Sequence, residues 1–395
     1  MPENSLSNFI FHPELKLTYL KKVSVFEAHA HCKKIRITEY CPKCATPSNL
    51  TYDSRRVRVK DAPIRGTGTI LFIRKRRLWC SPCRKPFTEP VAGIGKGKRH
   101  TDRYARGILW ACENFSDLTA VRRAYRASSS LVYDVYYRKL EQKVGEKVNY
   151  PWPKIVGIDE HAFKKARYGA PTEFVTMIVD HSNRRVREVV LGKTTAALSL
   201  TLAEIPGREN VEVVTLDLCD PFKNFVREFF PKAKIVADKF HVLRLLSPAL
   251  LRRRKEITGT RSDLRAKKLL LMSSYKLRYP ERLALHRFME RFPELHEVYL
   301  WKERLHGLYR TRGYDKAKKA LQGMCDEMAS SQIPEVKTLR RTLLKWREEI
   351  LNYFLTGITN ARTEGFNNKA KVVKRRAYGY KSFRNYRLKV LTACA

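Results

Sequence analysis

Three aspartates, Asp159, Asp217 and Asp238, each follow a short run of apolar residues that is typical of a buried strand. A single carboxylate at such a position is usually a turn former or a helix cap. Three in one sheet favour another interpretation, because neighbouring strand ends bring carboxylates together and a bound cation relieves their repulsion. Two Mg²⁺ ions held in this way activate a water molecule and stabilise the leaving oxygen of a phosphodiester.

A fourth acid, Glu364, lies in a polar segment, residues 360–371. A helix through this segment would carry several polar side chains on one face, namely those of Asn360, Glu364, Asn367 or Asn368, and Lys371. One carboxylate among amides and cations suits the binding of a metal ion together with phosphate. The alternative is an ordinary polar stripe that faces solvent.

Two C-x-x-C motifs, Cys41 with Cys44 and Cys80 with Cys83, lie 35 residues apart. Each motif presents two thiolates on a tight turn, and Zn²⁺ prefers four such ligands in a tetrahedron. Strand-like residues between the motifs indicate a hairpin that would bring them together. Two unrelated turns or one redox pair are the alternatives, but a redox site needs no second pair. We expect a closed four-cysteine zinc site with a structural role.

Basic residues flank the second cysteine pair, and a helical region follows them. Such runs often form a solvated face, but beside a zinc module they indicate contacts with DNA phosphates. The cations concerned are Arg74, Lys75, Arg76, Arg77, Lys96, Lys98 and Arg99. Residues 118–126 and 131–142 have the spacing of a helix-turn-helix, with Ser129 and Ser130 at the N-terminal end of the second helix, which would enter the major groove.

Charge and composition narrow the class of protein. The 395 residues include 80 Lys and Arg against 39 Asp and Glu, a formal net charge of +41. Nucleic acid is the polyanion that best suits this excess, and an anionic membrane surface is the second candidate. No apolar run approaches the ~20 residues of a membrane-spanning helix. Nine cysteines, an odd number, suit a reducing compartment, so we expect a cytoplasmic protein.

Strand and helix signals alternate after a proline-rich linker at residues 151–153. The spacing predicts strands at 155–158, 174–179, 186–191, 211–216 and 235–237, a helix at 222–230, and helices throughout 242–353. The second and third strands would form a hairpin. This order predicts an α/β fold with a mixed sheet and helices on both faces.

Several spaced blocks together resemble the ISL-three family of bacterial insertion-sequence transposases. They are Gly157-Ile-Asp-Glu-His161, Leu216-Asp217, residues 231–242 with their Asp-Lys-Phe-His element, Thr363-Glu-Gly-Phe-Asn-Asn-Lys369, and residues 374–380. The resemblance covers nearly the whole chain and implies an RNase H-like catalytic domain with a large all-α insertion. The expected parts are an N-terminal segment 1–40, a zinc-ribbon-like module 41–99, a helix-turn-helix 100–150, and a catalytic domain 151–395 with its insertion at about 245–355.

Carried over by position, the resemblance makes Asp159, Asp217 and Glu364 the catalytic DDE triad, which would hold two Mg²⁺ or Mn²⁺ ions. Asp238 and His241 would support this site, although a purely structural histidine is equally compatible with the pattern. Cations of the C-terminal segment would hold double-stranded DNA across the Glu364 helix, and they are Lys369, Lys371, Lys374, Arg375 and Arg376. Aromatic residues between them either stack on DNA or pack on the sheet.

The implied activity is that of a DNA transposase. It would bind the terminal inverted repeats of its insertion sequence near the nucleoid and catalyse Mg²⁺-dependent strand cleavage and strand transfer. Joining two DNA ends implies a homodimer or a larger assembly. A catalytically inactive DNA-binding protein, either a repressor or a transposase relic, is the competing interpretation. An RNA-binding factor would explain the charge but not the acids at the strand ends.

Overall fold

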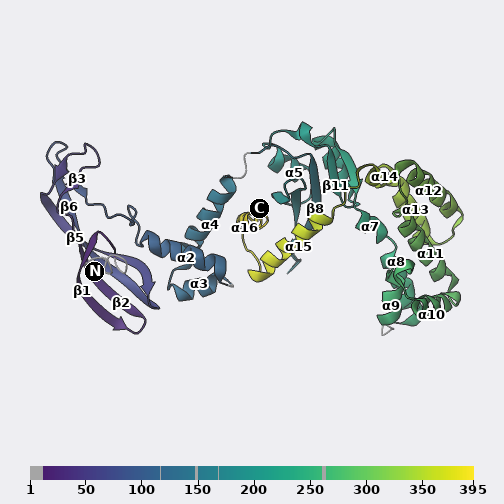
Figure 1. The fold of residues 1–395 in the computed structure, drawn as a ribbon, viewed down its shortest axis with the longest axis horizontal. Helices are drawn as coiled ribbons and strands as arrows, with labels where there is room; N and C mark the ends of the chain where they lie inside the picture. The colour runs from purple at the N-terminus through teal and green to yellow at the C-terminus, as the bar shows by residue number, and fades with distance from the viewer. Residues whose placement is uncertain (1–11, 116, 147–149, 168, 260–263) are drawn as a thin grey trace. The chain divides into compact units, whose positions relative to one another are not determined.

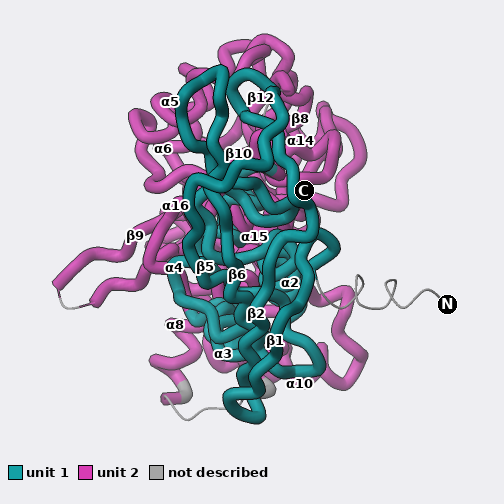
Figure 2. Tube along the Cα trace, turned by 90° about the vertical axis from the view of Figure 1, so that its left-hand side faces the viewer, with its two compact units in different colours: residues 1–142, 376–378 teal, residues 143–375, 379–395 magenta. Residues whose placement is uncertain are grey.

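The computed structural model describes residues 12–115, 117–146, 150–167, 169–259 and 264–395 (Figure 1). The chain divides into two compact units, which Figure 2 distinguishes by colour. The first comprises Met1–Gln142 with Arg376–Tyr378, and the second comprises Lys143–Arg375 with Gly379–Ala395. No helix in the described ranges combines the length and apolar character needed to cross a bilayer.

A five-stranded sheet forms most of the first unit. Its order is β1-β2-β6-β5, with β7 also paired to β6. The strands are β1 (Leu15–Ser24), β2 (Glu27–Lys34), β5 (Thr51–Ile64), β6 (Thr67–Cys80) and β7 (Lys85–Thr88). The hairpin expected between the cysteine pairs is therefore present as β5 and β6. Because β2 pairs in parallel with β6, hydrogen bonds join segment 1–40 to segment 41–99, and no break in the sheet falls at residue 40.

Three helices follow the sheet, namely α2 (Asp102–Asn114), α3 (Leu118–Ala124) and α4 (Ser129–Gly145). Side-chain oxygens cap each start, since Thr101 accepts from the N–H of Tyr104 and Asp117 from those of Thr119 and Ala120. Ser128 accepts from the N–H of Leu131, 3.3 Å away, so α4 begins earlier than the periodicity predicted.

The second unit contains a mixed sheet in the order β10-β9-β8-β11-β12. The strands are β8 (Ile155–Lys164), β9 (Glu173–Asp180), β10 (Arg185–Leu191), β11 (Val213–Leu216) and β12 (Lys234–Ala237). The first three are antiparallel neighbours, and β11 runs parallel to both β8 and β12. The predicted hairpin and the α/β class are confirmed. Strand β8 differs from the expectation in continuing past Asp159 to Lys164, because β9 pairs with it over that length.

Helices surround this sheet and fill the long segment before Glu364. Those outside the segment are α5 (Thr195–Leu202), η1 (Arg208–Asn210), α6 (Asp220–Phe229), α15 (Ala361–Arg376) and α16 (Phe383–Ala393). Those within it are α7 (Lys239–Leu243), α8 (Ser247–Thr258), α9 (Leu264–Leu271), η2 (Ser274–Lys276), α10 (Tyr279–Glu290), α11 (Pro293–Leu308), α12 (Tyr314–Glu327), η3 (Met328–Ser330), α13 (Pro334–Lys345) and α14 (Arg347–Thr356).

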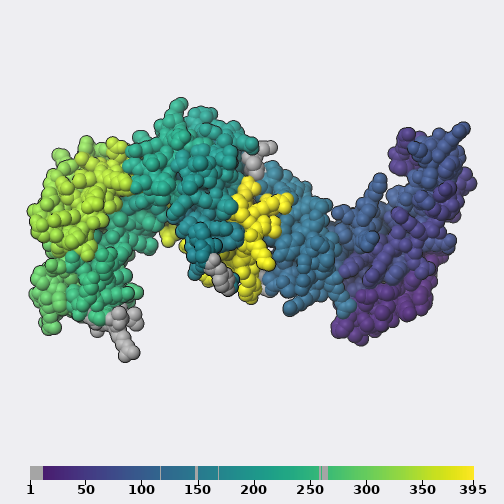
Figure 3. All heavy atoms as spheres, turned by 180° about the vertical axis from the view of Figure 1, so that it is seen from behind, coloured from purple at the N-terminus to yellow at the C-terminus, as the bar shows by residue number. Residues whose placement is uncertain are grey.

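One hydrophobic core is continuous from the sheet into these helices. It includes Val156 and Leu216 on strands, Val298 on α11, and Ile350 on α14, which packs against β12. Figure 3 shows the helices of the insertion, in green, lying directly against the part of the same unit that contains the sheet. The insertion is thus an extension of the sheet's own core.

Helix α15 lies against β8 through polar side chains. The Thr363 hydroxyl lies 2.9 Å from Nε2 of His181, and Oδ1 of Asn360 accepts a hydrogen bond of 2.8 Å from Thr215. Gly157 of β8 permits this approach: a Cβ there would overlap Thr363 Oγ1 and His181 Nε2 and would lie 3.1 Å from Asn360 Oδ1. The absence of a side chain at 157 therefore sets how closely the helix and the strand can pack.

We predict that Gly157→Ala lowers the stability of the second unit by about 1–3 kcal/mol, because α15 or its partners must shift to admit the methyl group. Thermal unfolding of the full chain measures the effect. Gly365→Ala is the matched control, since a Cβ there meets nothing within 4 Å, and a helical Gly→Ala change stabilises by roughly 0.5–1 kcal/mol. Equal unfolding temperatures for the two variants would contradict the packing described here.

Candidate active site and zinc site

Strand pairing places three acidic residues at the same height along three neighbouring strands, β8, β11 and β12, where β11 and β12 end. Thr215 pairs with Gly157, so Asp217 and Asp159 both lie two residues further along parallel strands. Leu216 pairs with Ala237, so Asp238 follows at the same level. Asp217, Asp238 and His241 each offer a ligand atom, and these atoms lie within 4.8 Å of one another.

His241 bridges two of these carboxylates. Its Nδ1 lies 2.8 Å from Asp238 Oδ2 and 3.0 Å from Asp217 Oδ1. Asp238 also caps α7 by accepting from the backbone N–H of His241, which fixes the imidazole relative to β12. The hydrogen bond with Asp238 and the nearby negative charges raise the pKa of His241, because they favour the protonated ring.

Burial and mutual repulsion make the carboxylates reluctant to ionise. Desolvation, followed by the charge of Asp159, raises the pKa of Asp217 to about 7. Desolvation also raises the pKa of Asp159, although hydrogen bonds from the Glu160 N–H and the Asn367 amide oppose it. Perturbed, clustered carboxylates of this kind mark functional sites more often than structural ones.

A chain of hydrogen bonds fixes Asp159 from behind. Asn367 donates from Nδ2 to Asp159 Oδ2, and its Oδ1 lies 2.9 Å from His161 Nδ1. The Tyr386 hydroxyl lies 2.6 Å from the other nitrogen, Nε2. The consistent assignment is that His161 donates to Asn367 and accepts from Tyr386, and burial lowers the pKa of His161 to about 4. Local sequence pattern could not predict this role for His161 and Tyr386, because the residues that meet lie 206 and 225 positions apart.

Glu364 lies on α15, one turn before Asn367, and is exposed. Among the described residues, the ligand group at this edge contains neither Glu364 nor Asp159. The helix itself is anchored at the carboxylates, because the Asn367 amide donates to Asp159. Of the two neighbouring amides, Asn367 is buried and contacts Asp159, whereas Asn368 is exposed.

The donor atoms fit a divalent cation. Oδ1 of Asp238 is buried and accepts no hydrogen bond within the described structure, which is costly for a carboxylate oxygen unless a cation or water meets it. Carboxylate oxygens suit Mg²⁺, and a neighbouring imidazole nitrogen is also acceptable to Mn²⁺.

The four cysteines of the two C-x-x-C motifs converge in the first unit. The first motif lies between β3 (Glu39–Tyr40) and β4 (Pro47–Ser48), and the second follows β6. The Sγ atoms of Cys41 and Cys83 are 4.0 Å apart, and those of Cys44 and Cys80 are 3.4 Å apart. Thiolates around zinc in a tetrahedron lie ~3.8 Å from one another. Hydrogen bonding with Thr46 lowers the pKa of Cys44 to about 6, whereas hydrogen bonding with Cys44 raises the pKa of Cys83. This cluster supports a structural Zn²⁺.

The run of cations at 74–77 separates into different environments. Arg76 donates to the buried carboxylate of Glu89 and to the carbonyl oxygens of Arg36 and Ile37, so it stabilises the fold. Arg77 pairs with Asp53, Lys75 is half-buried, and Arg74 is exposed. Four consecutive cations therefore differ in whether they are accessible to a DNA phosphate.

Another basic surface, on the open face of the first sheet, was not predicted. Arg56 lies opposite Arg74, and Arg58 lies opposite Phe72. Phe72 stacks on His31 with ring centroids 5.1 Å apart, and Tyr19 lies 5.7 Å beyond His31. We call the residues Tyr19, His31, Arg56, Arg58, Phe72 and Arg74 the sheet face. The alternation of Arg56 and Arg58 along one strand was the only signal in the sequence.

The other predicted DNA contacts are mostly exposed. They include Lys96, Lys98, Arg99, Ser129, Ser130, Lys369, Lys371, Arg375 and Arg376. Lys374 instead donates to the carbonyl oxygen of Ala162, 2.8 Å away, and so helps to hold α15 against β8. Of the aromatic residues in the C-terminal segment, Tyr386 is buried against Phe163, whereas Tyr378 is 91% exposed.

We predict that Cys80→Ser releases zinc and unfolds the turns around the motifs, because three thiolates leave the tetrahedral site incomplete. Metal analysis of the purified full chain measures the zinc content. Cys112→Ser provides the control, since Cys112 lies in α2 outside the cluster. An unchanged zinc content in Cys80→Ser would refute the four-cysteine site.

We also predict that His161 and His181 contribute a loss of stability to the second unit as the pH falls from about 6.5 to about 4, opposed by Asp217, whose pKa burial raises to about 7. Burial lowers the pKa of His161 and of His181 to about 4, so in that range the unfolded chain binds protons that the folded chain does not. Each histidine accounts for up to about 3 kcal/mol. Urea unfolding at several pH values gives the free energy of unfolding as a function of pH. This free energy should change less steeply with pH in His181→Gln than in the unaltered protein, and equally steeply in the exposed control His286→Gln. Identical slopes for all three proteins would contradict it.

Comparison with known proteins agrees with this architecture. A family model described as transposase (DDE_Tnp_ISL3) matches residues 156–390, and a model described as the zinc-finger of transposase IS204/IS1001/IS1096/IS1165 matches residues 38–83. The chain is 25% identical over 366 residues to the transposase for insertion sequence element IS1001 of Bordetella parapertussis, which covers 89% of this chain and 88% of the relative. A stretch of 60 residues is 38% identical to an ATP-dependent protease of Lactococcus lactis subsp. lactis, but it covers only 15% of this chain and 19% of that protein. The first model spans more than half of the chain, and this protein therefore belongs to the ISL3 family of transposases.

Proposed function

We propose that this transposase binds the terminal inverted repeats of its own insertion sequence and cleaves and transfers DNA strands with Asp159, Asp217 and Glu364. The observation that carries the proposal is the common level of Asp159, Asp217 and Asp238 at one sheet edge, next to the helix that bears Glu364. The strand order, three antiparallel neighbours followed by two parallel strands, supports an RNase H-like assignment for the catalytic domain.

Asp159 and Asp217 would hold Mg²⁺ or Mn²⁺, with Glu364 as the third acidic residue. When bound, two such ions would lower the pKa of a water and neutralise charge on the scissile phosphate. Burial, followed by the negative charge of Asp159, raises the pKa of Asp217, and a bound cation would favour the ionised carboxylate.

The protein's own groups position these acids. Asn367 orients the Asp159 carboxylate, and His161 and Tyr386 orient Asn367 in turn. His241 and Asp238 support Asp217 from the other side. Catalysis then depends on alignment and charge neutralisation, without a covalent bond between enzyme and DNA.

DNA would contact both units. In the first unit, α4 would bind the inverted repeat as the recognition helix of a helix-turn-helix. The sheet face and the exposed cations Lys96, Lys98 and Arg99 would bind the same repeat. In the second, Lys369, Lys371 and Arg375 would hold DNA beside Glu364. The net charge of +41 predicts steep salt dependence of binding. The reaction joins two ends, so we propose a homodimer or larger assembly on DNA in the bacterial cytoplasm, close to the nucleoid.

We predict that Asp217→Asn reduces Mg²⁺-dependent nicking of DNA carrying the element ends by at least ~100-fold, because the amide removes a ligand charge from the metal site. DNA affinity should change by less than about twofold, since Asp217 is not placed among the DNA contacts. Nicking and gel-shift assays on the same preparation measure both.

Asp220→Asn is the matched control, because Asp220 is an exposed acid three residues away that pairs with Lys345. It should nick normally. If Asp217→Asn loses DNA binding together with nicking, Asp217 is structural. If the unaltered protein binds element ends and does not nick them, the protein is an inactive DNA-binding relative.

A further inference from the structure

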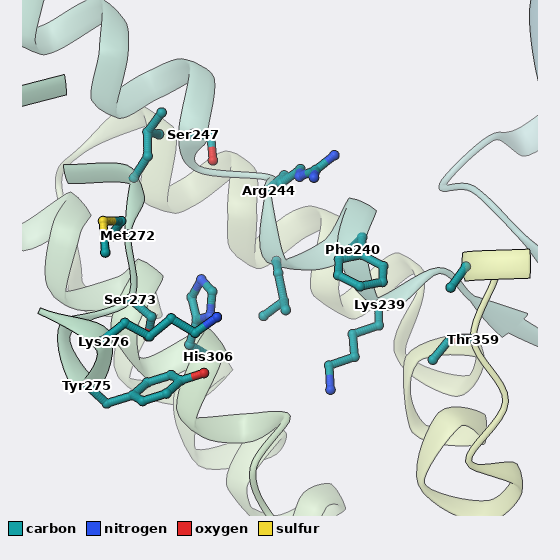
Figure 4. Close-up of a pocket in the computed structure, with 13 residues that line it drawn as sticks. Lys239, Phe240, Arg244, Ser247, Met272, Ser273, Tyr275, Lys276, His306 and Thr359 are labelled. Carbon is teal, nitrogen blue, oxygen red and sulfur yellow. The ribbon is translucent and has the colours of Figure 1, made fainter. Parts of the chain in front are cut away.

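A groove of about 530 Å³ lies in the second unit, on the face of α7 opposite to Asp238 and His241 (Figure 4). Figure 4 shows Lys239, Phe240 and Arg244 along α7, and Tyr275, Lys276 and His306 across the groove from Phe240. Thr359 and Ala361, immediately before and at the start of α15, complete the wall.

The side chains of this groove combine positive charge with exposed aromatic rings. Arg244 and Lys276 supply cations, whereas the Lys239 ammonium bonds the Tyr353 hydroxyl; no acidic residue is among the described residues that line the groove. Phe240 is 39% exposed and Tyr275 is 61% exposed, so both rings are accessible to a ligand. The guanidinium of Arg310 lies 5.2 Å over the Tyr275 ring and adds to the positive charge.

A ligand that matches this surface carries a phosphate and a flat, apolar base. Bases of single-stranded DNA stack on exposed aromatic rings while cations follow the backbone. The volume lies within the ~300–1,000 Å³ of pockets that enclose one small ligand, so it suits a single nucleotide and is too small to enclose a base-paired duplex. Bases leave the stack most easily where they are already unpaired.

The groove is next to the acids along two segments of chain. Helix α7 begins directly after Asp238, and Thr359 and Ala361 flank Asn360, whose side chain bonds Thr215 of β11. Glu364 follows on α15 one turn later. The groove therefore shares α7 and the start of α15 with the elements that position Asp238 and Glu364.

We propose that this groove holds one unpaired nucleotide of the strand that is cut, with its base against Phe240 and Tyr275 and its phosphate beside Arg244 and Lys276. The inference rests on the proposed DNA cleavage for the identity of the strand. It gives the helical insertion a role in binding, since segment 271–276 and His306 belong to that insertion.

The test compares two DNAs, a blunt duplex and the same duplex with a short single-stranded thymidine tail. Fluorescence anisotropy measures their affinity for the full-length protein in buffer without added divalent ions. The unaltered protein should prefer the tailed duplex. Tyr275→Ala and Arg244→Ala should each reduce that preference, by roughly 5- to 100-fold for loss of a stacked base, and leave blunt-duplex affinity unchanged. Tyr275→Phe keeps the ring and should keep the preference. A tail that lacks its bases should bind the unaltered protein with the reduced affinity that the normal tail shows for Tyr275→Ala.

Tyr279→Ala and Arg282→Ala are matched controls, because both residues are exposed on α10 and do not line the groove. A tail preference that survives in the Tyr275→Ala/Arg244→Ala double variant, or that the control changes reduce equally, overturns the proposal. Since binding is measured without Mg²⁺, failure of nicking with an intact tail preference rejects only the proposed cleavage. Normal nicking without any tail preference rejects only the groove.

Discussion

Hydrogen bonds between buried polar side chains hold α15 against the second sheet. Thr363 and Asn367 are buried on the helix, and Asn360 is buried directly before it. Asn360 and Asn367 meet partners on the sheet and Thr363 meets His181 in the turn after β9, and an unsatisfied buried amide or hydroxyl costs about 1–3 kcal/mol. An apolar seam tolerates sliding, whereas these directional contacts allow one register. The position of Glu364 relative to Asp159 follows from that register, and so does the wall of the groove beside α7.

Local pattern was sufficient to predict the acids at the sheet edge. Apolar runs followed by Asp217 and Asp238 marked the ends of short parallel strands, and the hairpin of β9 and β10 was evident from its turn. Asp159 differed, since β8 continues for five residues beyond it while paired to β9 alone. The continuous apolar run stops there because only alternate side chains of β8, those of His161 and Phe163, are buried beyond Asp159, although the hydrogen bonding to β9 continues.

The support around Asp159 could not have been predicted from the sequence. His161, Asn367 and Tyr386 come from a strand and two helices separated by about half the chain, and nothing local indicates that they meet. The four cations at 74–77 also show that the sequence alone does not predict which charged side chains are accessible. Arg74 and Arg76 point to the same face of β6, but only Arg76 meets the carboxylate of Glu89 and the carbonyl oxygens of Arg36 and Ile37, which come from other parts of the chain.

The shared core of the sheet and the helical insertion has a consequence for how such proteins diversify. Ile350 and Val298 pack in the same cluster as Val156 and Leu216, so the insertion has no separate interior that could be lost without exposing part of the sheet. Exchange of this segment between relatives by recombination would need to preserve the helix that covers β12. Evolutionary change should therefore be concentrated in the outer helices, and the junctions with the sheet should vary least in length.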